Sequence, residues 1–319
     1  MNRTLIIYES HYGTTKKIGY YLSLILGFSK HVDIENAPYN LDGYPNIIFL
    51  FCFYGHKTAE KLKVYLDKIN MYLPNKNIAL IGVGLEQSNL ASYTSPICSL
   101  MSKKPDIIEF LHGNLIVNKL NEHDKILLQS FLKKNNINFE DVEKFNMDEV
   151  VNCAYNLKDY FYQASANKIN NDKLLNEIEK FITSHNTCSL ATCNNSSIRN
   201  TPIEYIYYKN NFYFITEGGL KFLGLLQNEN VSICIYDSYK SMDKVFGIQI
   251  SGIGEIIPET NSEYYSIMKK KNLTKELLNK FSVNLFLIKV CPSRFEFLNT
   301  NFSKNGYEPK QILDFKLPQ

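Results

Sequence analysis

The sequence predicts two domains of different class: an α/β domain with a parallel sheet, followed by a mainly β domain with an antiparallel sheet. The length of 319 residues is that of about two ordinary domains. Strand-like and helix-like segments alternate in the first half, whereas short strand-like segments dominate after residue 173. We therefore expect domains at 1–163 and 173–319, with the core of the first at about 1–135 and a polar linker at 164–172.

The first domain is expected to be a doubly wound parallel sheet with helices on both faces. Continuous apolar runs at Thr4–Tyr8, Asn46–Phe53 and Asn77–Val83 indicate strands that are buried on both faces. Apolar residues recur at helical spacing in Lys16–Leu26 and Ala59–Ile69. The remaining predicted elements are strand pieces at Ile107–Leu111 and Asn114–Val117, a closing helix at Asp124–Leu132 and a trailing helix at Phe139–Gln163.

The second domain is expected to be an antiparallel barrel behind one leading helix. The helix is predicted at Lys173–Ser184, where apolar residues lie on one face. A hairpin turn is predicted at Lys209–Asn211. Many short strands with few helices are typical of a barrel, and here they are Thr187–Cys193, Thr201–Tyr208, Phe212–Thr216, Val231–Tyr236, Val245–Ile257, Val283–Val290 and Phe295–Leu298.

Composition excludes several classes of protein. The chain has 35 Lys and Arg against 32 Asp and Glu, a balance that argues against nucleic acid as a partner. No apolar run approaches the ~20 residues of a membrane span, and the first residues do not resemble a signal peptide. The seven cysteines are scattered without a Cys-x-x-Cys pair, which fits a reducing cytoplasm and predicts no metal site.

The loop after the first strand carries the clearest chemical signal. Ser10, Thr14 and Thr15 supply hydroxyl groups at the start of the first predicted helix. A helix N-terminus offers N–H donors and the positive end of the helix dipole, both of which suit a phosphate. The same side chains could instead serve only as helix caps, and the spacing alone does not decide between these roles.

Three loops of this half resemble the flavodoxin family, over about residues 1–135. Residues 6–15 (IIYESHYGTT) are similar to the flavodoxin signature, and Gly82–Leu85 (GVGL) follows the fourth strand, where the family has a second flavin loop. Residues 53–56 (FYGH) look like the Tyr-Gly-His loop of the protoporphyrinogen-oxidase type of flavodoxin. The chain departs from electron-shuttling flavodoxins in lacking Trp and an acidic balance, and the resemblance leaves Tyr12 or Tyr54 to stack on the ring. It implies FMN held by Ser10, His11, Tyr12, Gly13, Thr14, Thr15, Phe53, Tyr54, Gly55, His56, Gly82 and Gly84.

Residues 173–299 resemble the FMN-binding split barrel of the pyridoxamine 5′-phosphate oxidase family. The resemblance rests on an ordered series of motifs: TCSLAT, RNTP, FYFIT, GGLKF, NVSICIY and GIQISGIGE. It implies that Arg199, Thr201 and Pro202 lie along the flavin or its phosphate, that Thr216 and Lys221 contact the phosphate, and that Gln249 bonds the ring or ribityl chain. Lys221 could also be a solvated helix residue, and Gln249 a polar group on the barrel face. All six histidines precede residue 186, which disfavours heme held by a histidine of the barrel.

Together the resemblances imply an FMN-dependent oxidoreductase or electron-transfer flavoprotein with one or two FMN per chain. The flavodoxin domain would pass electrons to or from the barrel, and the partner would be a redox protein or a small-molecule acceptor. The alternatives are a non-catalytic electron carrier with a dimerising or ligand-binding barrel, and a tetrapyrrole-related oxidase. The family also implies a homodimer formed through the barrel. The sequence assigns no catalytic side chain.

Overall fold

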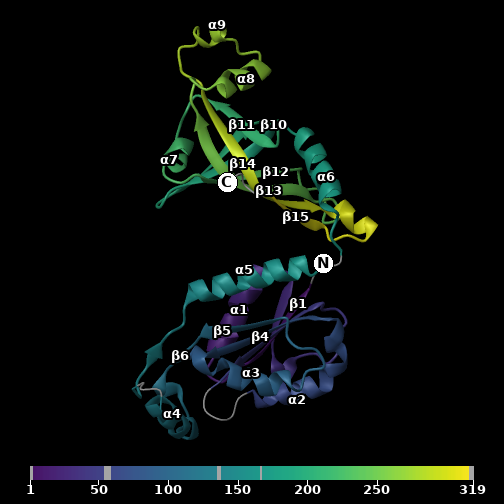
Figure 1. Cartoon of the computed structure of the whole chain (residues 1–319), viewed down its shortest axis with the longest axis vertical. Coiled ribbons are helices and arrows are strands. Elements are labelled where there is room, and N and C mark those ends of the chain that lie inside the picture. Colours follow the sequence, from purple (N-terminus) through teal and green to yellow (C-terminus); the bar gives the residue numbers. More distant parts are fainter. Residues whose placement is uncertain (1–2, 54–58, 135–137, 166, 316–319) are drawn as a thin grey trace. The chain divides into compact units, whose positions relative to one another are not determined.

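The chain folds into two compact units, Met1–Ala166 and Asn167–Gln319. The computed structural model describes residues 3–53, 59–134, 138–165 and 167–315 (Figure 1). The division falls within the polar stretch 164–172, between a helix that ends at Gln163 and one that begins at Asn171.

The first unit is built on a parallel five-stranded sheet with the order β2-β1-β3-β4-β5. β1, β3 and β4 are the apolar runs, and their side chains are buried along nearly their whole length. β2 is an edge strand that the sequence did not predict, because its residues SKHVD are polar and half-exposed. The strands are β1 (Thr4–Glu9), β2 (Ser29–Asp33), β3 (Asn46–Cys52), β4 (Asn77–Gly84) and β5 (Ile107–His112).

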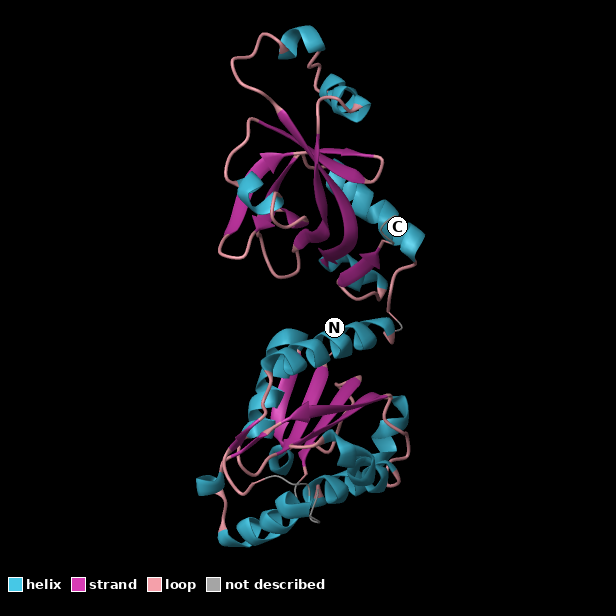
Figure 2. Cartoon of the chain, turned by 60° about the vertical axis from the view of Figure 1, so that its left-hand side comes forward, coloured by secondary structure: helices cyan, strands magenta, loops and turns pink. Residues whose placement is uncertain are grey.

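Helices cover both faces of this sheet, as a doubly wound fold requires (Figures 1 and 2). α1 (Thr14–Leu26) and α5 (Met147–Gln163) pack against one face. α2 (Glu60–Ile69) and α3 (Leu90–Cys98) contribute to the core on the other face. The predicted doubly wound parallel sheet is confirmed.

One helix was predicted at the right residues but with the wrong packing. α4 (Glu122–Lys134) lies where the sequence predicted the closing helix, but it packs in a small separate core beside β6 (Asn114–Leu115) and β7 (Val142–Glu143). The helix that closes the sheet is α5. It begins at Met147 rather than Phe139 because the Asn146 side chain caps it, accepting a hydrogen bond from the N–H of Asp148.

The second unit is an antiparallel sheet that curls into a split barrel. Its order is β10-β11-β14-β13-β12-β8-β9, with β15 paired to β14. The two ends of this order, β9 and β10, are consecutive in the chain and separated only by Tyr205, so the sheet curls until its ends meet, with no β9–β10 ladder among the described strands. The strands are β8 (Thr187–Cys193), β9 (Ile198–Glu204), β10 (Ile206–Tyr208), β11 (Asn211–Thr216), β12 (Asn230–Tyr236), β13 (Phe246–Ile257), β14 (Phe286–Asn299) and β15 (Lys310–Asp314).

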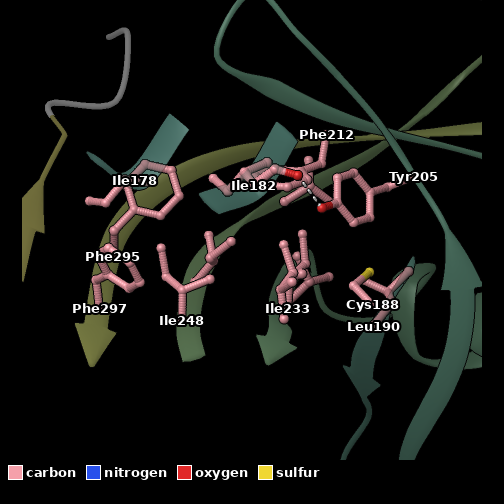
Figure 3. Packing of buried hydrophobic residues seen from close by; sticks show 14 of the residues in the cluster. Ile178, Ile182, Cys188, Leu190, Tyr205, Phe212, Ile233, Ile248, Phe295 and Phe297 are labelled. Atoms are coloured by element: carbon pink, nitrogen blue, oxygen red, sulfur yellow. Dashed lines mark hydrogen bonds between the residues drawn. The ribbon is translucent and has the colours of Figure 1, made fainter. Parts of the chain in front are cut away.

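The barrel core is apolar and is sealed by α6 (Asn171–Thr183), the predicted leading helix. Ile178 and Ile182 of α6 pack on the inward residues of the strands (Figure 3). Tyr205, at the break between β9 and β10, donates a hydrogen bond from its hydroxyl to the carbonyl of Ile182 at 2.6 Å. This bond ties the closing point of the sheet to the helix and explains why the single strand predicted at Thr201–Tyr208 is interrupted.

The other differences lie at the ends of the barrel strands. β14 is one continuous strand, although Pro292 and charged residues made it look like two segments in the sequence. The sequence did not predict α8 (Ser262–Lys270), α9 (Lys275–Leu278) or β15. A short helix, α7 (Lys221–Leu225), begins within the GGLKF motif and lies against β8 and β9. No helix within the described residues is long and apolar enough to cross a membrane.

Glu9 is expected to stabilise the first unit by capping α2. Its buried carboxylate accepts a hydrogen bond from the N–H of Leu62 at 3.0 Å, and no side chain at Ala59, the residue before α2, does so. We expect Glu9→Ala to lower the free energy of unfolding of this unit by about 1–2 kcal/mol, measured by denaturant unfolding. Glu35→Ala removes an exposed carboxylate that pairs with Lys61 and should cost clearly less, since exposed ion pairs contribute little to stability. Equal losses in the two variants would contradict the capping role.

Candidate functional site

The first candidate site is built by the turn between β1 and α1. Gly13 has a φ of +95°, a left-handed conformation that favours glycine, and this lets the chain reverse directly into the helix. The Ser10 hydroxyl accepts a hydrogen bond from the N–H of Gly13 at 3.2 Å. Among the residues that the structure describes, no side chain caps α1, so its N-terminal end presents backbone donors beside the hydroxyls of Thr14 and Thr15.

A cavity lies at this edge of the sheet, beyond the carboxyl ends of β1, β3 and β4. Its lining includes the hydroxyls of Ser10, Thr14 and Thr15 and the thiol of Cys52. It also includes the apolar side chains of Leu85, Leu115, Leu120 and Leu128. The described residues that line the cavity include no Asp, Glu, Lys or Arg. The cavity therefore combines hydroxyl groups with apolar surface.

Cys52 is a neutral thiol in this cavity. Burial raises its pKa to about 11, and the nearby Glu9 carboxylate acts in the same direction. Hydrogen bonds from the backbone of His11 and the side chain of Thr15 oppose this shift but do not overcome it. The nucleophilic form of cysteine is the thiolate, so Cys52 is not suited to nucleophilic chemistry at neutral pH.

Two glycines at the end of β4, Gly82 and Gly84, make room for Phe53. A Cβ atom at Gly82 or at Gly84 would lie 2.8 or 2.7 Å from the Phe53 ring, closer than real contacts. Phe53 is buried and stacks on Tyr93, with the ring centroids 4.4 Å apart. Gly84 and Phe53 line the cavity, whereas Gly82 packs behind them. These glycines thus have a packing role whether or not a ligand contacts them.

The second candidate site lies at the rim of the barrel, around α7. Lys221 is buried, and its ammonium group donates hydrogen bonds to the Thr216 hydroxyl at 2.8 Å and to the carbonyl of Gly218. Gly218 and Gly219 have φ values of +115° and +106°, which allow the turn that returns Lys221 to Thr216. Burial lowers the pKa of Lys221; the charge of Glu217 opposes this, and the positive charge of Arg199 adds to it.

Arg199 and Lys221 therefore lie close enough to repel each other, and neither forms an ion pair with a carboxylate among the described residues. Thr192, the partner of Arg199 across β8 and β9, is buried, and its hydroxyl oxygen has no hydrogen-bond partner in the described part of the chain. Gly224 of α7 packs directly over it, since a Cβ there would lie 3.0 Å from the Thr192 Cβ atom. Two cations that share no carboxylate partner among the described residues are what an anion would stabilise.

Comparison with protein families decides what these two units are. The flavodoxin domain family matches residues 5–141, and the pyridoxamine 5′-phosphate oxidase family matches residues 174–285. The chain is a fusion of a flavodoxin-like domain and a pyridoxamine 5′-phosphate oxidase-like domain. No curated protein sequence matches the chain.

Solved structures similar to the chain include the heme storage protein HutZ of Vibrio cholerae, with 13% identity over 37% of this chain and 88% of that one and a TM-score of 0.32. A FAD-binding protein of Mesorhizobium loti has 15% identity; the match covers 38% of this chain and 89% of that protein, with a TM-score of 0.30. General stress protein 26 of Bacillus anthracis has 18% identity; the match covers 44% of this chain and 98% of that protein, with a TM-score of 0.33. At these low identities and TM-scores we infer nothing about ligands from them.

In the flavodoxin-like domain most of the predicted residues come together. Ser10, His11, Tyr12, Thr14 and Thr15 line the cavity, as do Phe53 and Gly84. Gly13 shapes the turn, and Tyr54, Gly55 and His56 lie outside the described residues. Sequence reasoning missed Cys52, Asn114 and the wall leucines Leu115, Leu120 and Leu128. Of the leucines only Leu128 lies in a predicted helix, and a predicted helix does not say which surface it covers.

In the oxidase-like domain the predicted residues fall into two groups. Arg199, Thr216 and Lys221 lie at the rim beside α7. Pro202 and Gln249 belong to one row of residues that runs across neighbouring strands on the outer face of the sheet. Along this row Pro202 pairs with Ser189, Ser189 pairs with Cys234, and Cys234 pairs with Gln249. Thr201, next to Pro202, pairs with the core residue Leu190 and so faces the opposite side.

Proposed function

We propose that the chain is an FMN-dependent oxidoreductase or electron-transfer flavoprotein, in which the flavodoxin-like domain binds FMN and exchanges electrons with a flavin in the barrel. The observation that carries the proposal is the neutral donor cluster of Ser10, Thr14 and Thr15 at the uncapped start of α1. Such a cluster suits a phosphate monoester. The two family matches support a flavin-related role for the same regions.

The residues that line the flavodoxin-like cavity offer the chemical groups that the phosphate and the ring system of FMN require. The hydroxyls and helix N–H groups would bind the phosphate, and the apolar side chains of the lining would bury the ring system. Bound FMN would supply the redox chemistry, while the chain positions it and excludes water. The neutral lining adds no fixed charge next to the ring. Cys52 stays protonated and acts as a small uncharged wall residue.

The barrel rim fits the phosphate of a second flavin. Arg199 and Lys221 would each bond an anionic oxygen, and the phosphate charge would relieve their mutual repulsion. The hydroxyl of Thr216, which accepts a hydrogen bond from Lys221, lies at the same place. On this basis we propose up to two FMN per chain.

The alternative is an electron carrier whose barrel dimerises or stores a ligand without turnover. The two readings differ in how the reduced flavin is reoxidised. Rapid reoxidation by a small-molecule acceptor in stopped-flow absorbance supports the oxidoreductase. Electron exchange only with protein redox partners supports the carrier. The loop that suggested a tetrapyrrole-related oxidase, Tyr54–His56, lies outside the described residues.

A homodimer formed through the barrel is part of the proposal. Leu220, Leu223 and Leu226 expose 64%, 49% and 72% of their surface along one side of α7, next to the candidate anion site. Exposed apolar rows of this kind favour a protein contact. We expect a dimer mass by sedimentation equilibrium, and a shift to monomer in a Leu223→Glu, Leu226→Glu variant. A Leu24→Glu variant, which alters an exposed leucine of α1, should remain dimeric. A monomeric wild-type chain would contradict the proposal.

A further inference from the structure

Between β13 and β14 the chain leaves the barrel and forms an insert, residues 258–285, which contains α8 and α9 (Figure 1). The apolar side of α8 is buried against the barrel, since Tyr264 and Met268 form one core with Tyr213 of β11. The strand neighbours of Tyr213 belong to the barrel core, so α8 covers the opposite, outer face of β11. The first half of the insert is therefore packed on the barrel.

Polar contacts hold the insert at the same place. The Tyr213 hydroxyl donates a hydrogen bond to the Glu263 carboxylate of α8 at 2.6 Å. Lys289 of β14 pairs with the same carboxylate at 3.3 Å. At the end of α8, Lys271 pairs with Glu204 of β9 at 2.7 Å. Because three strands hold α8, the residues that follow it are presented at a defined place on the barrel.

The second half of the insert exposes apolar side chains to solvent. We call residues 274–284, which contain α9, the α9 segment; all of them except Leu278 are exposed. Leu277, Phe281 and Val283 expose 40%, 43% and 53% of their surface. Large exposed apolar side chains that are clustered, rather than scattered singly, mark a surface that contacts another molecule.

The charge of the insert is positive. It has five lysines against three glutamates, an excess of two positive charges in a chain whose net charge is +3. The lysines are Lys269, Lys270, Lys271, Lys275 and Lys280, and the glutamates are Glu259, Glu263 and Glu276. Within the part of the chain that the structure describes, Lys269, Lys275 and Lys280 form no ion pair. The exposed apolar side chains therefore lie among lysines that no ion pair neutralises.

The α9 segment ends beside the candidate anion site of the barrel. It leads within two residues to Phe286 at the start of β14, whose ring contacts that of Phe222 in α7 with the centroids 5.6 Å apart. A Cβ atom at Gly218 would lie 3.6 Å from the same Phe286 ring. The carbonyl of Gly218 accepts a hydrogen bond from Lys221. A protein bound to the α9 segment would therefore lie close to the loop that holds Lys221.

We propose that the α9 segment, together with Lys269 and Lys270 at the end of α8, is the docking surface for an acidic redox protein that exchanges electrons with the barrel. This proposal rests on the proposed function and gives the chemistry of its protein partner. In the exchange, the reduced centre of the partner loses one electron and the flavin proposed for the barrel gains it. Encounters between redox proteins bury little surface and are steered by opposite charges, which suits a few exposed apolar side chains among lysines.

The structure of the α9 segment favours a protein partner over a membrane surface. α9 spans only Lys275–Leu278, and the rest of the segment is irregular. The backbone groups of an irregular segment find no hydrogen-bond partners in hydrocarbon. Helices that lie on membranes present a longer apolar face than one turn provides.

The test is the affinity of the full-length protein for an acidic two-iron ferredoxin, measured by isothermal titration calorimetry. We expect binding at low ionic strength that weakens by at least about tenfold at about 0.5 M salt, because salt screens exposed charges. Lys275→Glu with Lys280→Glu should weaken the low-salt affinity by at least about tenfold, since it replaces attraction by repulsion. Phe281→Ser should also weaken binding, because it removes an apolar contact.

The matched control is Lys240→Glu with Lys244→Glu. It makes the same change of charge on two exposed lysines of the loop between β12 and β13, and the 12 residues of β13 separate this loop from the insert. The control should bind ferredoxin like wild type. Equal affinities in the two double variants, or no binding by wild type at low salt, would overturn the docking surface. Binding of wild type to vesicles with about 30% phosphatidylserine that is lost in Lys275→Glu with Lys280→Glu would assign the segment to a membrane and overturn it as well.

Electron transfer separates failure of the docking surface from failure of the proposed function. Reduction of the FMN-loaded protein by reduced ferredoxin, followed by stopped-flow absorbance, should slow in Lys275→Glu with Lys280→Glu as much as binding weakens. If the barrel takes up no FMN, the proposed function fails, while salt-dependent binding of ferredoxin at the insert still supports the docking surface. Unchanged binding in the variant overturns the docking surface even where the barrel holds FMN.

Discussion

Replacing Ser10 and Thr15 together by alanine is expected to empty the flavodoxin-like domain of FMN. The two hydroxyls lie at the start of α1 in the lining of the cavity, where the described residues include no Lys or Arg that would compensate for them. A hydrogen bond to a charged group contributes about 1.5–3 kcal/mol, so losing two should weaken binding by at least about a hundredfold. The measurement is FMN titration followed by fluorescence, with the flavin content of the purified protein as a second readout.

The matched control for this double variant is Ser23→Ala with Thr94→Ala. Both hydroxyls donate to backbone carbonyls of the same unit, and neither residue lines the cavity. This control should bind FMN like wild type. The double variant should also leave any flavin in the barrel in place. Equal FMN affinity in the double variant and in wild type would show that the β1–α1 turn does not bind the phosphate.

Removing the two barrel cations should abolish the second site. Arg199→Ala with Lys221→Met takes away both charge-assisted contacts to an anion, and we expect at least about a hundredfold loss in the affinity of the barrel for FMN. Arg199→Ala alone should not destabilise the ligand-free barrel, because the charge of Arg199 disfavours the protonated form of Lys221. Thermal unfolding with and without FMN measures both effects.

Lys240→Met is the control for charge alone, since Lys240 is exposed in the same unit and away from α7. It should leave FMN binding unchanged. If Arg199→Ala with Lys221→Met binds FMN in the barrel as tightly as Lys240→Met does, the rim is not the phosphate site. A clear loss of ligand-free stability in Arg199→Ala would contradict the repulsion between the two cations.

The sequence predicted the elements whose pattern of apolar residues matches the way the element is buried in the structure. β1, β3 and β4 are buried on both faces, and a continuous apolar run leaves no other placement. β2 was missed because an edge strand needs little apolar surface, and α3 because Pro96 and its serines and threonines disguise a helix. The helix α4 was predicted, but only tertiary packing shows that its leucines lie at a cavity instead of on the sheet.

The residues of the candidate sites likewise include some that the sequence could reveal and some that it could not. Ser10, Thr14 and Thr15 are close in the sequence, so a single turn brings them together and the motif could reveal them. Cys52 and the wall leucines reach the cavity from other elements, and nothing in their local sequence marks them. In the barrel, the register of strand pairing decides which residues of different strands are neighbours. It places Gln249 and Pro202 in one cross-strand row and Arg199 outside that row.

The most direct test of the account is native mass spectrometry of the full-length protein after incubation with excess FMN and removal of the free flavin. We predict a chain that retains one or two FMN non-covalently and shows the absorbance of an oxidised flavin, with one FMN lost in the Ser10→Ala, Thr15→Ala variant. A wild-type chain that retains no FMN would contradict the account.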